Sequence, residues 1–251
     1  MRVLVTNDDG IHAPGLKVLE KIARVLSDDV WVVAPEYEQS GASHSLTLLD
    51  PLRVRRLSPR RFAVGGTPTD CVVMALNQIV EGRKPDLLLS GVNRGANMAE
   101  DVTYSGTIAA AMEGTLLGIP SIAMSQVFQR PEPIHWTTAE KHGPALVRKL
   151  RKAGWPEDVL INVNYPAVKA GDVTGTTITV QGRRDVGQIQ IHEREDPRGG
   201  SYYWLGFRRQ LGKPGAMTDL GATMRGQISV TPLKMTFTHG ATRKALQAAF
   251  K

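Results

Sequence analysis

The sequence predicts an α/β fold in which helices cover both faces of a mostly parallel sheet. Over about the first 165 of 251 residues, apolar β-type runs alternate with stretches whose apolar residues recur at helical spacing. Such alternation builds right-handed strand–helix–strand units and therefore three layers. We expect a three-layer, Rossmann-like catalytic core domain over residues 1–171, followed by a C-terminal part over residues 172–251.

Each expected element is an apolar run bounded by glycine, proline or polar turn residues. The expected strands are 2–6, 29–34, 86–90, 120–124, 159–163 and, after a long excursion, 226–231. The expected helices are 15–27, 68–81, 106–117, 137–152 and a short terminal one near 241–250. Segments 45–57 and 62–65 indicate extra β structure beside the main sheet.

The character of the chain changes after about residue 172. Polar β-type runs at 174–181 and 188–193 precede the turn sequence 196–200 and the aromatic patch Tyr202, Tyr203 and Trp204. These features together indicate a long hairpin that projects from the core. An aromatic patch on such a hairpin is typical of an interface between subunits.

Composition and charge set broad limits on function. The net charge of +7 favours anionic partners. Its densest segment, 53–61, alternates like a solvated edge strand and lacks the interleaved aromatic residues of a nucleic-acid groove. A single cysteine, Cys71, excludes an internal disulfide, and the most apolar window, 108–124, is broken by Glu, Gly and Pro. With no leader ahead of the first strand, we expect a cytoplasmic protein without a membrane span.

Two adjacent carboxylates, Asp8 and Asp9, follow the first strand where Gly10 breaks it. Ligands of open α/β sheets bind outside the carboxyl ends of the strands. Neighbouring carboxylates there suit a hard divalent cation such as Mg²⁺ or Mn²⁺. A polar strand-to-helix turn is the alternative interpretation, because the same composition suits it.

Two further loops carry polar groups beyond predicted strands. After strand 86–90, glycines allow close backbone approach, and the amide oxygen of Asn93 or Asn97 suits a cation without adding charge. Ser105, Gly106 and Thr107 then open a helix, whose N-terminal N–H groups favour phosphate. An ordinary βα turn and a plain helix cap remain the alternatives.

The loop after strand 29–34 offers the hydroxyls of Ser40 and Ser43 to a metal or a phosphoryl oxygen. It also carries His44, and His12 lies close to Asp9 in sequence. No flanking residue marks His44 as catalytic, although imidazole titrates near neutrality, and His12 is only slightly the better candidate because of its closeness to Asp9. We therefore expect His44 to be a surface loop residue.

Five motifs in order over residues 1–125 resemble the SurE family of survival-protein nucleotidases. They are the segments 7–15, 40–43, 66–71, 90–97 and 104–114. The resemblance implies a divalent-metal-dependent phosphatase acting on nucleoside 5′- and 3′-monophosphates, and in some members on short polyphosphate. Carried over by motif, the metal ligands are Asp8, Asp9, Ser40 and Asn93. The C-terminal third matches more loosely. The family exchanges a β-hairpin arm between subunits, which residues 184–210 match, and this implies a homodimer or homotetramer.

The residues agree with a mechanism in which one Mg²⁺ or Mn²⁺ per subunit grips a phosphate oxygen. We predict that Asn97, Ser105, Gly106 and Thr107 hold the other phosphoryl oxygens, and that Asp8 or Asp9 is the catalytic acid or base. Attack by a metal-bound water and an aspartyl-phosphate route both remain open. Two other classes compete: a basic nucleic-acid-binding module without turnover, and a structural subunit whose carboxylates bind a metal for stability. We do not expect stable nucleic-acid binding.

Overall fold

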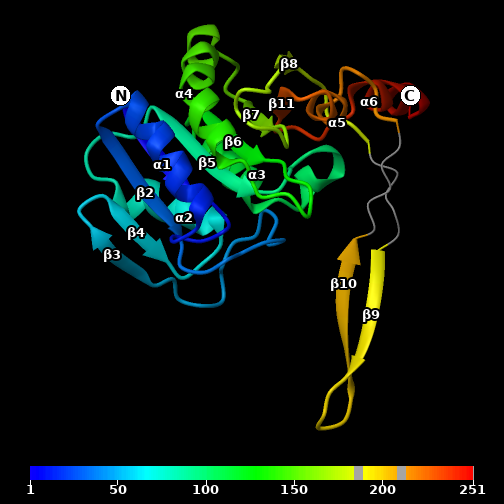
Figure 1. Ribbon diagram of the computed structural model, residues 1–251, viewed down its shortest axis with the longest axis horizontal. Coiled ribbons are helices and arrows are strands. Elements are labelled where there is room, and N and C mark those ends of the chain that lie inside the picture. Colours follow the sequence, from blue (N-terminus) through cyan, green and yellow to red (C-terminus); the bar gives the residue numbers. More distant parts are fainter. Residues whose placement is uncertain (184–188, 208–212, 251) are drawn as a thin grey trace.

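The computed structural model describes residues 1–183, 189–207 and 213–250. Within them, nine strands form one mixed sheet in the order β3-β4-β2-β1-β5-β6-β7-β11-β8 (Figure 1). Their bounds are β1 (Arg2–Thr6), β2 (Asp29–Pro35), β3 (Val54–Ser58), β4 (Arg61–Val64), β5 (Leu87–Arg94), β6 (Ser121–Gln126), β7 (Val159–Tyr165), β8 (Gly175–Ile178) and β11 (Gln227–Lys234). Every neighbouring pair from β4 to β7 is parallel, which confirms the expected α/β class.

Helices cover both faces of this sheet. They are α1 (Pro14–Leu26), α2 (Pro68–Met74), α3 (Gly106–Leu116), α4 (Trp136–Ala153), α5 (Asp219–Met224) and α6 (Gly240–Ala249), with a π-helical turn η1 (Ala75–Ile79) and a 3₁₀ helix η2 (Ala99–Thr103). α1 and α4 share one core with Val3 and Val5 of β1. α2 and α3 share another with Leu4. Alternate side chains of one strand therefore supply the two cores.

The central strands lie close to their expected positions, and most differences occur at their carboxyl ends. β5 runs four residues beyond the predicted end at residue 90. Gly91 makes this extension possible, because a Cβ there would lie 2.1 Å from the carbonyl oxygen of Met124 on β6. Of segment 45–57, only the part from Val54 forms a strand. α5 and η2 were not predicted, since both are too short to show helical periodicity.

The prediction that 174–181 and 188–193 belong to one hairpin is wrong. β8 instead pairs in parallel with β11 at the edge of the main sheet. The polar sequence of this segment indicated an exposed strand. Thr179, just beyond β8, is nevertheless buried, and its hydroxyl forms hydrogen bonds with those of Ser229 at 2.8 Å and Thr231 at 2.7 Å. Polar residues that bond one another can be buried. The division of the chain at residue 171 stays a prediction.

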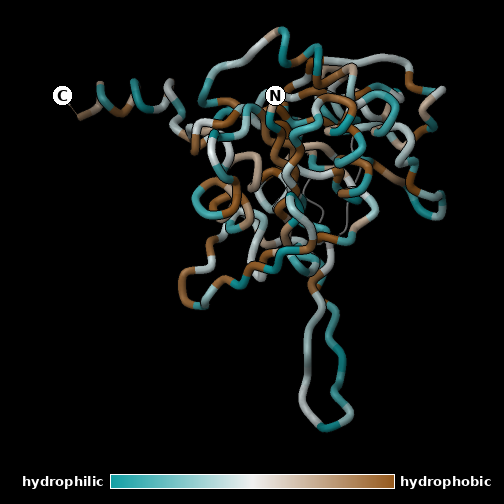
Figure 2. Tube along the Cα trace, turned by 90° about the vertical axis from the view of Figure 1, so that its left-hand side faces the viewer, coloured by the Kyte–Doolittle hydropathy of each residue, from teal (hydrophilic) through white to brown (hydrophobic). Residues whose placement is uncertain are grey.

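The hairpin itself consists of β9 (Ile189–Glu195) and β10 (Ser201–Phe207), paired antiparallel as a separate sheet. Figures 1 and 2 show it standing away from the core, and Figure 2 shows one of its strands as hydrophilic. The ends of the expected arm, at 184–188 and 208–210, lie outside the described residues. We call the described part, residues 189–207, the arm.

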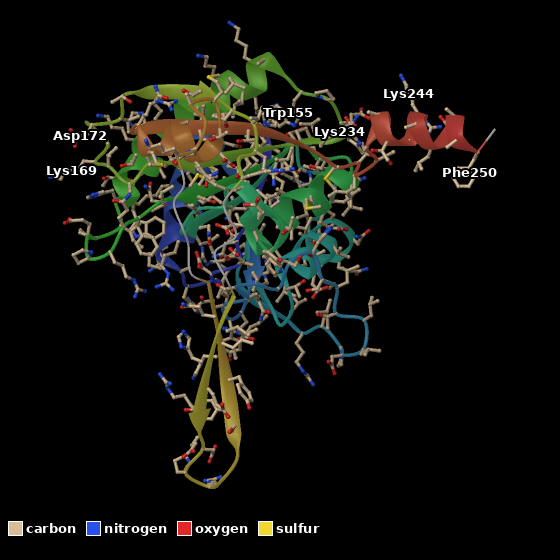
Figure 3. All side chains as sticks on the ribbon, turned by 90° about the vertical axis from the view of Figure 1, so that its right-hand side faces the viewer. Trp155, Lys169, Asp172, Lys234, Lys244 and Phe250 are labelled. Carbon is tan, nitrogen blue, oxygen red and sulfur yellow. The ribbon has the colours of Figure 1, made fainter. Side chains whose placement is uncertain are left out.

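Figure 3 shows α6 extending from the sheet with Phe250 at its far end, and no residue of α6 is buried. Among the described residues, no helix has the length and apolar character needed to cross a membrane.

Candidate functional site

The polar loops meet at one edge of the sheet. β4, β2, β1, β5 and β6 run parallel, so their carboxyl ends all lie at this edge. The chain moves from β1 to β2 on one side, while β5 pairs with β1 on the other. Such a reversal of strand order opens a crevice for a ligand. Asp8 and Asp9 follow β1 directly and therefore lie at this crevice.

Asp8 is buried against the N-terminus of α3. The Thr107 hydroxyl donates to Asp8 Oδ1 at 2.6 Å. A Cβ on Gly106 would lie 2.8 Å from the Cβ of Asp8, so only glycine allows the helix to approach this closely. Burial raises the pKa of Asp8 to about 6, although the hydrogen bond from Thr107 lowers it, and the charge of Asp9 raises it further. The site therefore holds a carboxylate that is poorly solvated when ionised.

Asp9 is half-buried and lies beside the end of β5. The backbone N–H of Arg94 donates to Asp9 Oδ2 at 3.0 Å, and Asp9 Oδ1 has no hydrogen-bond partner among the described residues. Burial raises the pKa of Asp9, while the Arg94 N–H opposes this shift. Because Asn93 precedes Arg94 in the chain, this hydrogen bond places Asp9 close to Asn93.

The two neutral ligand candidates, Asn93 and Ser40, lie in the flanking loops. Asn93 Nδ2 donates to the Gly95 carbonyl at 3.0 Å, which leaves Oδ1 without a partner among the described residues. Ser40 is exposed, and its hydroxyl donates to Glu38 Oε1 at 2.8 Å. Its loop is tied to the site, since the backbone N–H of Gln39 donates to the Asp8 carbonyl at 2.8 Å.

This donor set fits a hard divalent cation. It offers two carboxylates, an amide oxygen and a hydroxyl, all of them oxygen ligands of the kind that Mg²⁺ and Mn²⁺ prefer. Across the described ranges, no three His, Cys, Asp or Glu side chains gather into a metal cluster. Donating to Glu38 leaves the lone pairs of Ser40 Oγ available to a cation, so Ser40 can serve as a ligand while it keeps this hydrogen bond.

The predicted phosphate-binding residues have unequal roles. Ser105 caps α3, because its Oγ accepts from the backbone N–H of Ile108 at 3.1 Å. The hydroxyl of Thr107 is used by Asp8. The helix's first turn nevertheless lies beside the carboxylate, so backbone N–H groups and the helix dipole face the same place. Accepting from Ile108 does not use the hydroxyl hydrogen of Ser105, which can still donate to an anion beside the backbone N–H groups of this turn, whereas the Thr107 hydroxyl is committed to Asp8.

Asn97 is buried within a network of asparagines. Its backbone N–H donates to Asn164 Oδ1 at 2.9 Å, and its carbonyl accepts from Asn162 Nδ2 at 2.8 Å. Its own Nδ2 donates to Ser125 Oγ at 2.8 Å. Since Asn162 and Asn164 are fully buried on β7, they fix the loop that carries Asn93 and Asn97.

Sequence reasoning missed these two asparagines and Asp219. Asp219 accepts from the backbone of Ala99 at 2.9 Å and of Gly182 at 2.9 Å, so it joins this loop to the chain just before the arm. The signal for Asn162 and Asn164 was present: two amides alternate in an otherwise apolar strand. Buried amides need partners, and these two find theirs in the backbone of Asn97. Asp219 gave no such signal.

The histidines are not placed as catalytic bases. His44 is half-buried rather than exposed, and its Nε2 lies 2.9 Å from Glu113 Oε2, which ties the loop to α3. Its burial could not be foreseen because Glu113 lies 69 residues away in sequence. His12 is exposed. Within the described part of the chain, neither side chain forms a hydrogen bond or ion pair with Asp8 or Asp9.

The basic segment 53–61 forms the edge strand β3 and its turn into β4. Its arginines pair with nearby carboxylates, Arg55 with Glu36 at 2.7 Å, Arg60 with Asp29 at 3.3 Å and Arg61 with Glu20 at 2.5 Å. These ion pairs neutralise part of the segment's charge. The arrangement agrees with an edge strand better than with a groove for nucleic acid.

Comparisons with known proteins identify the family. The model of the survival protein SurE family matches residues 3–188. Proteins named 5′-nucleotidase SurE from Parvibaculum lavamentivorans and Paramagnetospirillum magneticum are 60% and 59% identical, over 99% and 100% of this chain and 91% and 96% of theirs. A crystal structure of the SurE protein from Aquifex aeolicus covers 100% of both chains with a TM-score of 0.84 and 36% identity.

Proposed function

This chain belongs to the SurE family, and on that premise we propose that it is a 5′-nucleotidase, an enzyme that hydrolyses nucleoside monophosphates to nucleoside and phosphate. One observation supports this most: the carboxylate of Asp8 is buried against the N-terminus of α3 at the carboxyl edge of the sheet. A carboxylate that can hold a cation therefore lies next to the anion-binding N–H groups at the start of α3. A phosphoryl group is the ligand that needs both.

We propose that Asp8, Asp9, Ser40 and Asn93 hold one Mg²⁺ or Mn²⁺ per subunit. When bound, such a cation would neutralise phosphate charge and favour attack by water. The first turn of α3 binds the phosphoryl oxygens through backbone N–H groups. Asn97 is kept in register by Asn162 and Asn164, and so orients the other side of the group.

Asp9 is better placed than Asp8 to exchange protons with water. It is half-buried, and Oδ1 has no hydrogen-bond partner among the described residues, whereas Asp8 is held by Thr107. In the proposed reaction Asp9 accepts the proton of the attacking water. The same phosphate contacts serve 3′-monophosphates and the terminal group of short polyphosphate, so we propose these as further substrates. We also propose a cytoplasmic location, which suits a lone reduced cysteine.

The test is phosphate release from AMP by purified protein with Mn²⁺, then with excess EDTA. We expect turnover that EDTA abolishes, and a loss of about three orders of magnitude or more in Asp9→Asn, since charged ligands and bases typically contribute that much. Asp28→Asn, an exposed carboxylate outside the site, is the matched control. No release with any divalent metal would overturn the proposal. Tight, salt-dependent RNA binding without turnover would favour the nucleic-acid alternative.

We further propose that the arm pairs two subunits into a homodimer, which can pair again into a tetramer. Trp204 and Leu205 of the arm are 64% and 71% exposed, more than a monomer's surface usually leaves for such side chains. Replacing residues 189–207 with a short Gly/Ser turn should yield a monomer by light scattering. A dimer or tetramer that survives the deletion would contradict an arm-mediated interface.

A further inference from the structure

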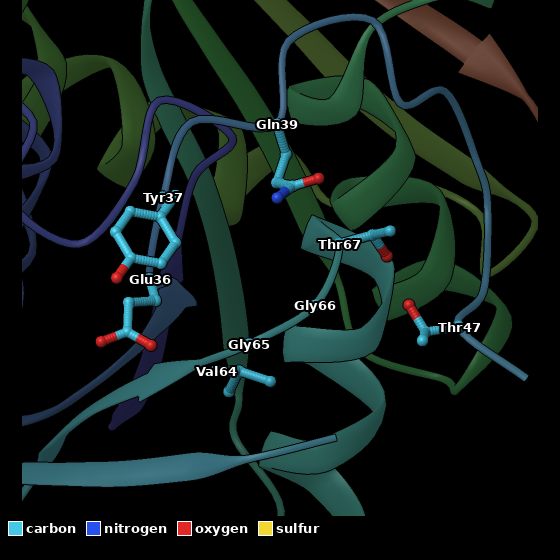
Figure 4. A pocket seen from close by; sticks show the side chains of 8 residues that line it. All are labelled: Glu36, Tyr37, Gln39, Thr47, Val64, Gly65, Gly66 and Thr67. Carbon is cyan, nitrogen blue, oxygen red and sulfur yellow. The ribbon is translucent and has the colours of Figure 1, made fainter. Parts of the chain in front are cut away.

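A cavity of about 340 Å³ lies beside the Asp8 site, within the size range of small-molecule pockets. One wall is the loop after β2, with Glu36, Tyr37 and Gln39, and the other is the turn 64–67 from β4 into α2, with Thr47 behind it. Figure 4 shows the Gln39 side chain reaching into the space between Tyr37 and Thr67. The function assigned so far uses none of these side chains.

The cavity adjoins the phosphate site on two sides. Gln39 donates its backbone N–H to the Asp8 carbonyl at 2.8 Å. On the α2 side, Pro68 follows the cavity residue Thr67, and a Cβ on Gly106 would lie 3.1 Å from Pro68 Cγ. Since Gly106 itself packs on Asp8, a molecule held by its phosphate at α3 is within reach of this cavity.

Most polar groups of the cavity wall are already bonded. The Thr67 hydroxyl donates to the Ser45 carbonyl at 2.8 Å, and the Thr47 hydroxyl donates to Asp70 at 2.6 Å. Glu36 Oε1 accepts from Arg55 at 2.7 Å. Within the described part of the chain, the amide of Gln39 and the phenol of Tyr37 have no hydrogen-bond partner, and Tyr37 is 74% exposed.

These free groups match one class of ligand. An exposed aromatic ring offers a face on which a flat heterocycle stacks, and base stacking tolerates every nucleobase. A carboxamide carries a donor and an acceptor side by side, the pattern that pairs with the edge of a base. The remaining wall consists of Val64 and the backbone of Gly65 and Gly66, with the Gly65 N–H donating to the Arg53 carbonyl, and its lack of bulky side chains suits the flat side of a ring.

We propose that this cavity is the nucleobase subsite of the enzyme, with Tyr37 stacking on the base and Gln39 bonding its edge. The inference rests on the proposed nucleotidase activity and adds where the nucleoside part is recognised. It makes Tyr37 and Gln39 specificity-determining residues, which bind substrate without touching the reacting phosphate. Phosphomonoesters without a base would use the phosphate site alone.

The experiment compares KM for AMP with KM for ribose 5-phosphate, which lacks the base. We expect Tyr37→Ala and Gln39→Ala to raise KM for AMP about tenfold, because losing one stacked base contact has an effect of that order. KM for ribose 5-phosphate should stay within about twofold of the parent value. Tyr37→Phe keeps the ring and should resemble the parent. Gln78→Ala, an exposed glutamine outside the cavity, is the matched control.

Other outcomes either contradict the nucleobase subsite or contradict the proposed nucleotidase activity, and the two cases can be told apart. An unchanged KM for AMP in both alanine variants would overturn it. Equal rises for AMP and ribose 5-phosphate would assign the two residues to the phosphate site and also overturn it. If the parent releases no phosphate from either compound, the proposed function fails. In that case, AMP binding measured by equilibrium dialysis tests the subsite on its own. Weaker AMP binding by both alanine variants supports the subsite. AMP binding equal to that of the parent, or no AMP binding by the parent, overturns it.

Discussion

Asp8→Asn should stabilise the metal-free protein at neutral pH. Burial raises the pKa of Asp8 from its ordinary 3.8 to about 6. Each pKa unit corresponds to about 1.4 kcal/mol, so ionised Asp8 costs the folded state about 3 kcal/mol. Asparagine has nearly the same shape and keeps an oxygen for the Thr107 hydroxyl, while it removes the charge. The predicted gain is therefore up to about 3 kcal/mol in the free energy of unfolding.

The gain should depend on pH with a definite sign. The folded pKa lies above the unfolded one, so the folded state binds the proton more tightly and loses stability as pH rises from about 4 to 6. Below about pH 4 the carboxyl is protonated in both states, and the parent and variant should be nearly equal. Above pH 6 the full difference should appear. Urea titration in EDTA at several pH values, followed by tryptophan fluorescence at fixed protein concentration, measures it.

Two results would refute this reasoning. One is a stability difference between parent and Asp8→Asn that is the same at pH 4 and pH 7.5, and the other is a less stable variant at pH 7.5 without metal. Asp28→Asn, an exposed carboxylate, should show no gain and serves as the control. Mn²⁺ at about a thousand times its Kd should reverse the order, since it stabilises only the protein that binds it, by about 4.1 kcal/mol.

Three further predictions concern residues around the site. Thr107→Val removes the hydrogen-bond donor to Asp8, so the pKa of Asp8 should rise further. The Mn²⁺ affinity measured by calorimetry should therefore fall more at pH 6.5 than at pH 8.5, and an equal loss at both pH values would contradict this. Asn164→Ala leaves the buried Asn97 N–H unpaired, which should lower the free energy of unfolding by about 1–3 kcal/mol, as urea titration would measure, and should lower kcat. A variant with the parent's stability and kcat would refute the role of this network. Burial, and then the charge of Asp70, raise the pKa of the Cys71 thiol well above its usual range. Mass spectrometry should therefore show that iodoacetamide at pH 8 labels Cys71 in urea but not in the native protein, and rapid labelling of the native protein would contradict this.

The edge that carries the candidate site was largely predictable because its residues lie at strand ends. Asp8, Asp9 and Asn93 each follow an apolar run that parallel topology brings to one edge, so the local pattern alone indicated their proximity. Ser105 was predictable as a helix cap for the same local reason. The roles of these residues in catalysis stay predictions.

What the sequence by itself determined about this protein is its α/β class, its family and the candidate ligand set, because those depend on periodicity and on short motifs. Only the tertiary structure decided that β8 joins the main sheet, that His44 pairs with Glu113, and that Asp219 holds the loop of Asn97. Each of these depends on hydrogen bonds between residues far apart in the chain. A polar side chain looks the same in sequence whether water or a distant partner satisfies it, and only the folded arrangement distinguishes the two.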